Sequence, residues 1–157
     1  MEIPLLRLAL IDRNNWRAAL AVEVTPDQLR FVAGHQPVAL VILAKAYVRP
    51  GNLEWEPLAV TARASVLGVV ALAHASTHTE LLHLAVDVSK QGQGIGSAAV
   101  ELLLRHVAET RPRTQDVWLS VHPENGRAQR LYRSRGFSPN GEVRDGEPIW
   151  STNLRCR

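Results

Sequence analysis

The spacing of apolar residues changes several times along the chain, and each change marks a different kind of element. Residues 5–11 form a short apolar run typical of a strand, whereas helical spacing dominates residues 16–33. The run at 38–48 fits either a helix or a strand, and its alanines favour a helix. Beyond residue 57, short apolar segments alternate with polar turns, which is typical of an antiparallel meander.

Apolar spacing in the second half of the chain predicts two further helices around one strand, and then a hairpin. The first of these helices is apolar over much of its surface, so we expect it to be largely buried. The expected elements are, in chain order, a strand at 5–11, helices at 16–24, 26–33 and 38–48, strands at 58–63, 66–74 and 80–86, a helix at 94–110, a strand at 117–121, a helix at 125–135, and hairpin strands at 142–144 and 148–154.

Residues with particular backbone preferences mark several of these boundaries. Thr25 fits the N-cap of a helix and Pro26 fits its first turn. Gly34 and Gly136 each follow a predicted helix, where a left-handed residue commonly ends it. Asp145-Gly146 is typical of the two-residue turn of a hairpin.

The order of elements predicts an α+β fold in a single domain that spans residues 1–157. The strand–helix–strand unit between residues 80 and 121 supplies a parallel step in a mixed sheet, and the hairpins supply antiparallel pairs. A chain of 157 residues is long enough to bury the core of one such domain.

Composition narrows the class of protein. Apolar residues make up 46% of the chain and charged residues 21%, which is ordinary for a soluble globular protein. The N-terminus lacks a secretory pattern and no apolar run reaches membrane-spanning length, so we expect a cytoplasmic protein without membrane contact. A single cysteine, Cys156, excludes a disulfide within the chain. The net charge is +3, but no nucleic-acid motif accompanies it, which argues against nucleic acid as a partner.

A glycine-rich turn, Gln91-Gly92-Gln93-Gly94-Ile95-Gly96, joins the predicted strand at 80–86 to the helix at 94–110. Glycine lets the backbone approach a ligand closely, and a helix start offers unpaired N–H groups with a partial positive charge. The turn is therefore a candidate site for a pyrophosphate. A dinucleotide fingerprint fits poorly, because residues 87–90 separate the strand from the glycines, and no Gly-Lys-Ser/Thr sequence supports a P-loop.

Two motifs resemble those of the GNAT superfamily of N-acetyltransferases. Gln91, Gly94 and Gly96 occupy the defining positions of its Gln/Arg-x-x-Gly-x-Gly/Ala motif. One strand further along, the chain is similar to the family pattern Asn-x-x-Ala-x-x-Leu-Tyr-x-x-x-Gly-Phe. The positions that match this second pattern are Asn125, Ala128, Leu131, Tyr132, Gly136 and Phe137.

The resemblance implies a mostly antiparallel central sheet with flanking helices, in which two neighbouring strands splay apart to hold acetyl-coenzyme A as co-substrate. The pantetheine arm would pair with the main chain of Leu84 and Val86, and the pyrophosphate would lie on the N–H groups of residues 92–97. The Leu84 N–H would face the thioester oxygen. The residues expected to bind the co-substrate are Leu84, Ala85, Val86, Gln91, Gly92, Gln93, Gly94, Ile95, Gly96, Ser97, Asn125 and Tyr132.

The implied reaction is transfer of the acetyl group to a primary amine by direct attack in a ternary complex. A protonated amine cannot attack, so a base or a water chain must take its proton, and the departing thiolate needs an acid. We expect Tyr132 to be the acid, because a phenol is protonated at neutral pH. Glu80 and His83 are the candidate bases, and His122 or water are alternatives. Glu80 lies where histone-type members of the family carry a catalytic glutamate.

The N-terminal third resembles the start of bacterial diamine acetyltransferases, which favours a polyamine or another small amine as acceptor. Two alternatives stay open: a protein or peptide amine as acceptor, and a non-catalytic sensor that binds acyl-coenzyme A. No metal is expected, because no cluster has the spacing of metal ligands, and the family leaves a homodimer open. The acidic residues expected to line a polyamine pocket are Asp12, Glu23, Asp27, Glu54 and Glu56.

Overall fold

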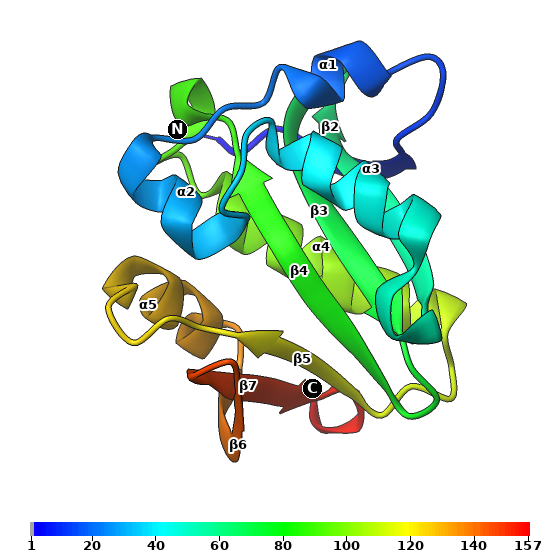
Figure 1. Ribbon diagram of the computed structural model, residues 1–157, viewed down its shortest axis with the longest axis vertical. Coiled ribbons are helices and arrows are strands. Elements are labelled where there is room, and N and C mark those ends of the chain that lie inside the picture. Colours follow the sequence, from blue (N-terminus) through cyan, green and yellow to red (C-terminus); the bar gives the residue numbers. More distant parts are fainter. Residues whose placement is uncertain (1) are drawn as a thin grey trace.

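A seven-stranded mixed sheet lies at the centre of the computed structural model, which describes residues 2–157 (Figure 1). The helices are α1 (Trp16–Leu20), α2 (Pro26–Val32), α3 (Val38–Val48), α4 (Ile95–Thr110) and α5 (Gly126–Ser134). The strands are β1 (Leu6–Leu10), β2 (Glu54–Ala62), β3 (Ser65–His74), β4 (His78–Val86), β5 (Asp116–Ser120), β6 (Ser138–Arg144) and β7 (Glu147–Asn153). The predicted α+β class is therefore confirmed.

The strand order is β1-β2-β3-β4-β5-β7-β6, and within the described residues β4 and β5 form the one parallel pair. Their pairing extends only from His78 opposite Asp116 to Glu80 opposite Trp118. Beyond Glu80 the two strands diverge (Figure 1). The splayed strand pair that the resemblance implies is therefore present, and the rest of β4 has an open edge.

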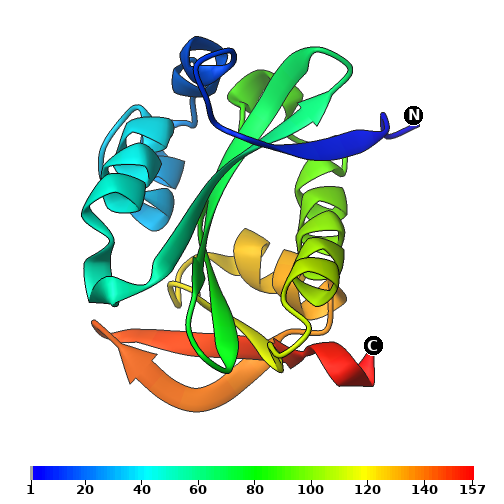
Figure 2. The same ribbon diagram turned by 90° about the vertical axis from the view of Figure 1, so that its right-hand side faces the viewer.

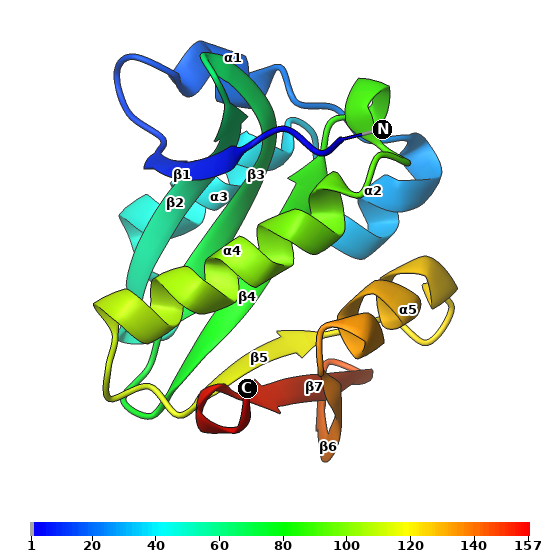
Figure 3. The same cartoon turned by 180° about the vertical axis from the view of Figure 1, so that it is seen from behind.

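Helices cover both faces of the sheet. α1, α2 and α3 lie over one face, whereas α4 and α5 lie over the other (Figures 2 and 3). Consecutive residues of β2 alternate between the two cores: Leu58 and Val60 pack on the α4 side, and Ala59 packs on the opposite side. None of the helices described for residues 2–157 combines the length and the hydrophobicity needed to span a membrane.

Local sequence signals correctly predict several element ends. The Thr25 side chain accepts a hydrogen bond from the Gln28 N–H (3.3 Å), and the Gln28 side chain accepts one from the Thr25 N–H (3.1 Å), so α2 begins with a capping box. Gly136 follows α5 with a φ of 89°. Asp145 and Gly146 have φ values of 52° and 81°, as the primed turn of the predicted β6–β7 hairpin requires.

Some strands and helices differ in length from the expectation. β2 begins at Glu54 rather than at residue 58, and β6 begins at Ser138 rather than at residue 142. In both strands the pairing extends into residues that show no regular apolar alternation, with Trp55 the one large apolar side chain among residues 54–57 and 138–141. α1 ends at Leu20, short of residue 24, because Val22 and Val24 are buried in the core beyond the helix.

A polar cluster joins β2 and β3 to the C-terminal half of α4. Glu56 accepts a hydrogen bond from His74 Nε2 and another, over 3.1 Å, from His106 Nε2. His74 Nδ1 lies 2.8 Å from Thr79 Oγ1 and is thereby fixed in orientation. The hydrogen bond from His74 is the main cause that lowers the pKa of Glu56 to about 2; burial opposes this shift, and the bond from His106 supports it.

Replacing Glu56 with glutamine is expected to lower the free energy of unfolding at neutral pH by about 2 kcal/mol. The pKa of Glu56 is about 2 in the folded protein, against an ordinary value of 4.5. The stabilisation is therefore complete above pH 4.5 and is lost as the pH falls toward 2.

Urea unfolding over a pH series measures this effect. The difference between wild type and Glu56→Gln should shrink as the pH falls below about 4.5. Glu109→Gln, on an exposed part of α4, is the control and should change the free energy of unfolding by less than about 0.5 kcal/mol. A difference that is the same at every pH would contradict this role of Glu56.

Candidate functional site

The glycine-rich turn leads directly into the start of α4. Gly94 is the N-cap residue with a left-handed φ of 80°, and no side chain from residues 2–157 caps the helix there. The Ala98 N–H donates back to the Gly94 carbonyl over 3.1 Å. The N–H groups of residues 95–97 precede this bond and are available to a ligand, and the helix dipole adds a partial positive charge. This end of α4 is suited to an anion.

The Gln91 side chain fixes the turn in place. Its Nε2 donates to the Val86 carbonyl at the end of β4 (2.9 Å) and to Gln28 Oε1 on α2 (3.0 Å). Gln28 Nε2 donates in return to Gln91 Oε1 over 2.8 Å. Gln91 therefore connects the turn to both β4 and α2.

At two glycines of the turn an added side chain would meet close neighbours. A Cβ atom at Gly96 would lie 3.1 Å from Leu131 Cδ1 on α5, and one at Gly94 would lie 3.0 Å from Ile3 Cδ1. At Gly94 the left-handed φ adds backbone strain for any other residue. The turn can therefore keep its position only with glycine at Gly94, and Gly96 keeps it close to α5.

The open edge of β4 turns main-chain groups toward the gap beside β5. The Asp87 N–H donates to the Leu67 carbonyl at the start of β3. Because main-chain groups alternate in direction along a strand, those of Leu84 and Val86 face the opposite, open side. His83, just before them, has a φ of 57° at an irregularity in the β3–β4 register. Leu84 and the N–H of Val86 therefore face a ligand that would lie between the strands, whereas the Val86 carbonyl already accepts from Gln91.

A cavity of about 290 Å³ lies between the turn, the open edge of β4 and α5. Of the residues expected to bind acetyl-coenzyme A, all except Gln93 line it. Gln93, which was expected to bind acetyl-coenzyme A, is not part of this lining. Lys90 and Arg127 add two cations to the lining. Unpaired N–H groups and cations around one cavity fit the phosphates of the expected co-substrate.

The second motif forms the beginning of α5, beside this cavity. Asn125 is the N-cap residue, and its Oδ1 accepts a hydrogen bond from the Ala128 N–H over 3.2 Å. Leu131 and Tyr132 pack against the core on the α4 side of the sheet, and the Tyr132 ring meets Phe137 edge to face at 5.7 Å. Burial raises the pKa of Tyr132 to about 12. The phenol is therefore protonated at neutral pH, as a general acid must be.

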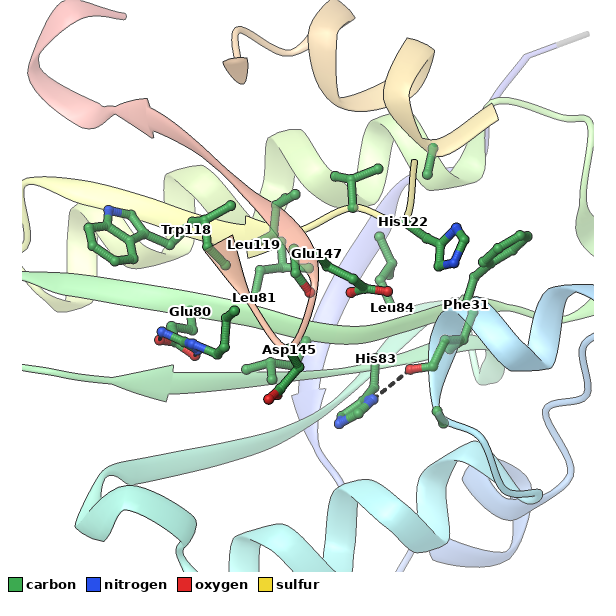
Figure 4. A pocket seen from close by; sticks show the side chains of 18 of the residues that line it. Phe31, Glu80, Leu81, His83, Leu84, Trp118, Leu119, His122, Asp145 and Glu147 are labelled. Carbon is green, nitrogen blue, oxygen red and sulfur yellow. Dashed lines mark hydrogen bonds and ion pairs between the residues drawn. The ribbon is translucent and has the colours of Figure 1, made fainter. Parts of the chain in front are cut away.

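A second cavity of about 880 Å³ adjoins the first and is bordered by β4, β5, α2 and the β6–β7 turn (Figure 4). Leu84, Asn125 and Tyr132 belong to the linings of both cavities. These residues therefore mark the junction, where molecules bound in the two cavities would meet.

Glu80 lines the larger cavity, but both of its oxygens are engaged. Arg144 forms two contacts of 2.8 Å with the carboxylate, and His78 Nε2 lies 3.4 Å from it. Burial acts to raise the pKa of Glu80, yet the bonds from Arg144 and His78 outweigh it and lower the pKa below its ordinary value. A carboxylate held in this way is a weak base.

The two histidines of the larger cavity are also engaged. His83 Nδ1 donates to the Val32 carbonyl (2.6 Å; Figure 4), so the lone pair of the neutral ring is on Nε2. This nitrogen lies 2.7 Å from Lys45 Nζ. Burial and, secondarily, the charge of Lys45 lower the pKa of His83, against the opposing bond to Val32. His122 Nδ1 accepts the Glu124 N–H over 3.0 Å. The assignment of a base among these side chains therefore stays a prediction.

The acidic residues expected around a polyamine lie elsewhere, so that expectation was wrong. Glu54 pairs with Arg111, and Glu56 belongs to the histidine cluster described above. As described for residues 2–157, the lining of the larger cavity contains none of the five expected residues, Asp12, Glu23, Asp27, Glu54 and Glu56. Its carboxylates are instead Glu80, Asp145 and Glu147.

Several residues of the site were not singled out by the sequence motifs. Arg127 lies in the first turn of α5, two residues after Asn125, and lines the smaller cavity. Its position within the second motif could have identified it from the sequence. Gln28, Lys45 and Glu147 had no such signal, since each reaches the site through the tertiary fold; Gln28 and Gln91 are 63 residues apart. In the described part of the chain, no group of three or more His, Cys, Asp or Glu side chains is arranged to hold a metal ion.

Known proteins resemble this chain in both sequence and structure. Residues 12–137 match the model of the Acetyltransferase (GNAT) family. Over 70 residues the chain is 36% identical to the spermine/spermidine N(1)-acetyltransferase of Bacillus subtilis (strain 168). This stretch covers 44% of the chain and 45% of the relative, so the chain spans about half the length of the curated relatives it matches.

Solved structures share the fold over nearly the whole chain. Spermidine N-acetyltransferase from Vibrio cholerae, in complex with CoA and spermine, has a TM-score of 0.73 at 15% identity, over 96% of both chains. AAC(6')-Ib, in complex with paromomycin and acetyl-CoA, has a TM-score of 0.76 at 16% identity, over 96% of this chain and 94% of the other. At such identities the likeness concerns the fold, whereas the family model spans most of the sequence. The chain belongs to the acetyltransferase (GNAT) family.

Proposed function

We propose that this protein transfers the acetyl group of acetyl-coenzyme A to the primary amine of a small molecule. The observation that carries the proposal is the shared lining of the two cavities. A donor in the smaller cavity and an acceptor in the larger one would meet beside Leu84 and Tyr132. Direct attack within a ternary complex suits this arrangement, because both reactants are held side by side.

Each group at the junction has a distinct task. When bound, acetyl-coenzyme A supplies a thioester that an amine can attack. The N–H groups of residues 95–97 hold the phosphates, and the main chain of Leu84 and Val86 holds the pantetheine amides. The Leu84 N–H stabilises negative charge that develops on the acetyl oxygen. The Tyr132 hydroxyl gives its proton to the departing sulfur.

The proton of the acceptor ammonium must leave before attack. Glu80 and His83 line the larger cavity, but Arg144 and Lys45 occupy their lone pairs. We therefore favour a chain of water molecules through this cavity to bulk solvent, and we keep Glu80 and His83 as the alternative bases.

The walls of the larger cavity favour a small acceptor over a peptide. Residues 30–34, from α2 and the turn after it, border the cavity on one side, and residues of the β6–β7 turn border it on another (Figure 4). An extended peptide needs an open groove. A polyamine, the acceptor in the names of two relatives, therefore belongs among the small amines to be tested first.

The release of coenzyme A in the presence of polyamines, amino acids, aminoglycosides and peptides tests the proposal. We expect turnover with at least one small amine, and none when its amine is blocked. Tight binding of acetyl-coenzyme A without turnover on any acceptor would overturn the proposal in favour of a sensor. Turnover with peptides alone would assign a peptide amine as the acceptor instead.

A further inference from the structure

The larger cavity contains charges of both signs, and two of its cations form ion pairs, one within the lining and one with Glu124 outside it. Arg144 pairs with Glu80 at 2.8 Å, and Arg30 pairs with Glu124 at 3.1 Å. Apart from these pairs, one cation and two carboxylates of the lining have no ion pair among residues 2–157. These three residues are Lys45, Asp145 and Glu147.

Lys45 is held at the cavity wall by defined contacts. Its Nζ reaches from α3 to lie 2.7 Å from His83 Nε2 on β4, and it lies 5.7 Å from the centre of the Trp55 ring. The bond from His83 Nδ1 to the Val32 carbonyl leaves Nε2 as an acceptor, so the Lys45 ammonium donates to it. An ammonium has three N–H groups, and two of them stay available to a molecule in the cavity.

The environment of Lys45 favours an anionic ligand. Burial lowers the pKa of Lys45, and the more distant charge of Glu80 opposes this only in part. A half-buried ammonium without a counterion gains interaction energy when an anion binds beside it. A second ammonium, such as the far end of a polyamine, would instead be repelled.

Asp145 and Glu147 lie on a different wall of the cavity. They belong to the β6–β7 turn and the first residue of β7, whereas Lys45 and His83 belong to α3 and β4. Figure 4 shows Asp145 and Glu147 on the hairpin and His83 on the side of α2 and α3. Carboxylates in this place attract the ammonium form of an acceptor and hold it in the cavity.

We propose that the acceptor is a small amine that also carries a carboxylate, with the carboxylate bound by Lys45 and the amine held toward Asp145 and Glu147. This inference rests on the proposed function and narrows its substrate class from amines in general to amino-acid-like molecules. Lys45 determines specificity, and His83 positions Lys45.

Recognition of the carboxylate does not change the transfer step. A proton of the ammonium passes to water, the amine nitrogen forms a bond to the acetyl carbon, and the bond from that carbon to sulfur breaks. The nitrogen gives a second proton to water, which leaves the neutral amide. The sulfur takes the proton of Tyr132, and solvent returns a proton to the phenol. The carboxylate of the acceptor takes no part in these steps, so it can serve entirely for recognition.

The first experiment compares amino acids of different chain length with their own carboxamides as acceptors for the wild-type protein. Each pair differs in the charge of one group and keeps the same amine. We expect kcat/KM to favour the free carboxylate by about 10- to 100-fold for the best pair. Spermidine and the simple diamines should be poorer acceptors than the best amino acid.

The second experiment repeats the comparison in Lys45→Gln. We expect kcat/KM for the amino acid to fall about 10- to 100-fold, mainly through KM, and that for the carboxamide to change less than about threefold. Lys45→Arg should restore part of the preference, because it keeps the charge. Arg105→Gln, on an exposed part of α4, removes the same charge far from the cavity and should leave both acceptors unchanged.

The two proposals fail in different ways. No transfer to any amine would overturn the proposed function itself. Transfer with equal or better rates for carboxamides or diamines would overturn the carboxylate inference and leave the proposed function standing. Equal losses of kcat/KM for both acceptors in Lys45→Gln would assign Lys45 a structural role and would also overturn the carboxylate inference. The wild-type comparison decides the matter even when Lys45→Gln folds poorly.

Discussion

Replacing Gly94 with valine is expected to lower the affinity for acetyl-coenzyme A by at least about 100-fold, or roughly 3 kcal/mol. Gly94 caps α4 with a φ of 80°, a conformation that a β-branched residue avoids. A Cβ atom there would also lie 3.0 Å from Ile3 Cδ1. The helix start must therefore rearrange, and the N–H groups of residues 95–97 lose the common direction that an anion requires.

Isothermal titration of each variant with acetyl-coenzyme A measures this affinity, and Gly141→Val supplies the matched control. Gly141 has a similar φ of 91° and lies in the exposed strand β6, where an added Cβ atom would meet no other atom within 4 Å. Both variants introduce the same backbone strain, but the second introduces it away from the turn. If Gly94→Val binds acetyl-coenzyme A within about threefold of the wild-type affinity, the start of α4 is not the phosphate site.

Local signals in the sequence predicted the elements well where one or two residues decide a boundary. Thr25 caps α2 through its own side chain, and the Asp145-Gly146 turn depends on its own backbone, so the neighbouring residues suffice to locate both. The full extent of β2 and β6 depends on pairing with the neighbouring strands β3 and β7, because the added residues show no regular alternation of their own. The exposed residues of β6 show no alternation, and a strand of that kind is visible only once its partner β7 is in place.

The sequence likewise predicts one part of the functional site better than the other. The residues expected to bind acetyl-coenzyme A lie in or beside two short motifs, and the fold brings all of them except Gln93 to the lining of one cavity. The lining of the larger cavity comes from α2, α3, β4, β5 and the β6–β7 turn. Charges such as Lys45 and Glu147 are ordinary surface residues in a sequence, and only their tertiary neighbours distinguish them. The acidic residues predicted for this cavity were wrong for that reason.

In the proposed reaction, the chemistry at the junction depends most directly on Tyr132. Replacing it with phenylalanine is expected to lower kcat by about 100- to 1,000-fold. The affinity for acetyl-coenzyme A should change less than about threefold, because phenylalanine keeps the ring that packs against Phe137. Single-turnover measurements with the best acceptor, together with titration of the co-substrate, separate the two quantities.

The pH profile provides an independent test of the same role. Because burial raises the pKa of Tyr132 to about 12, the phenol keeps its proton at every pH below that value and loses it only as the pH rises through it. Deprotonation of the acceptor amine should therefore raise the wild-type rate with pH, without a fall from loss of the acid until about pH 12. Tyr47→Phe, at the other tyrosine of the chain and 90% exposed, is the matched control and should match wild type. A wild-type kcat in Tyr132→Phe would show that the sulfur leaves without a proton from Tyr132, and the general acid would then be solvent.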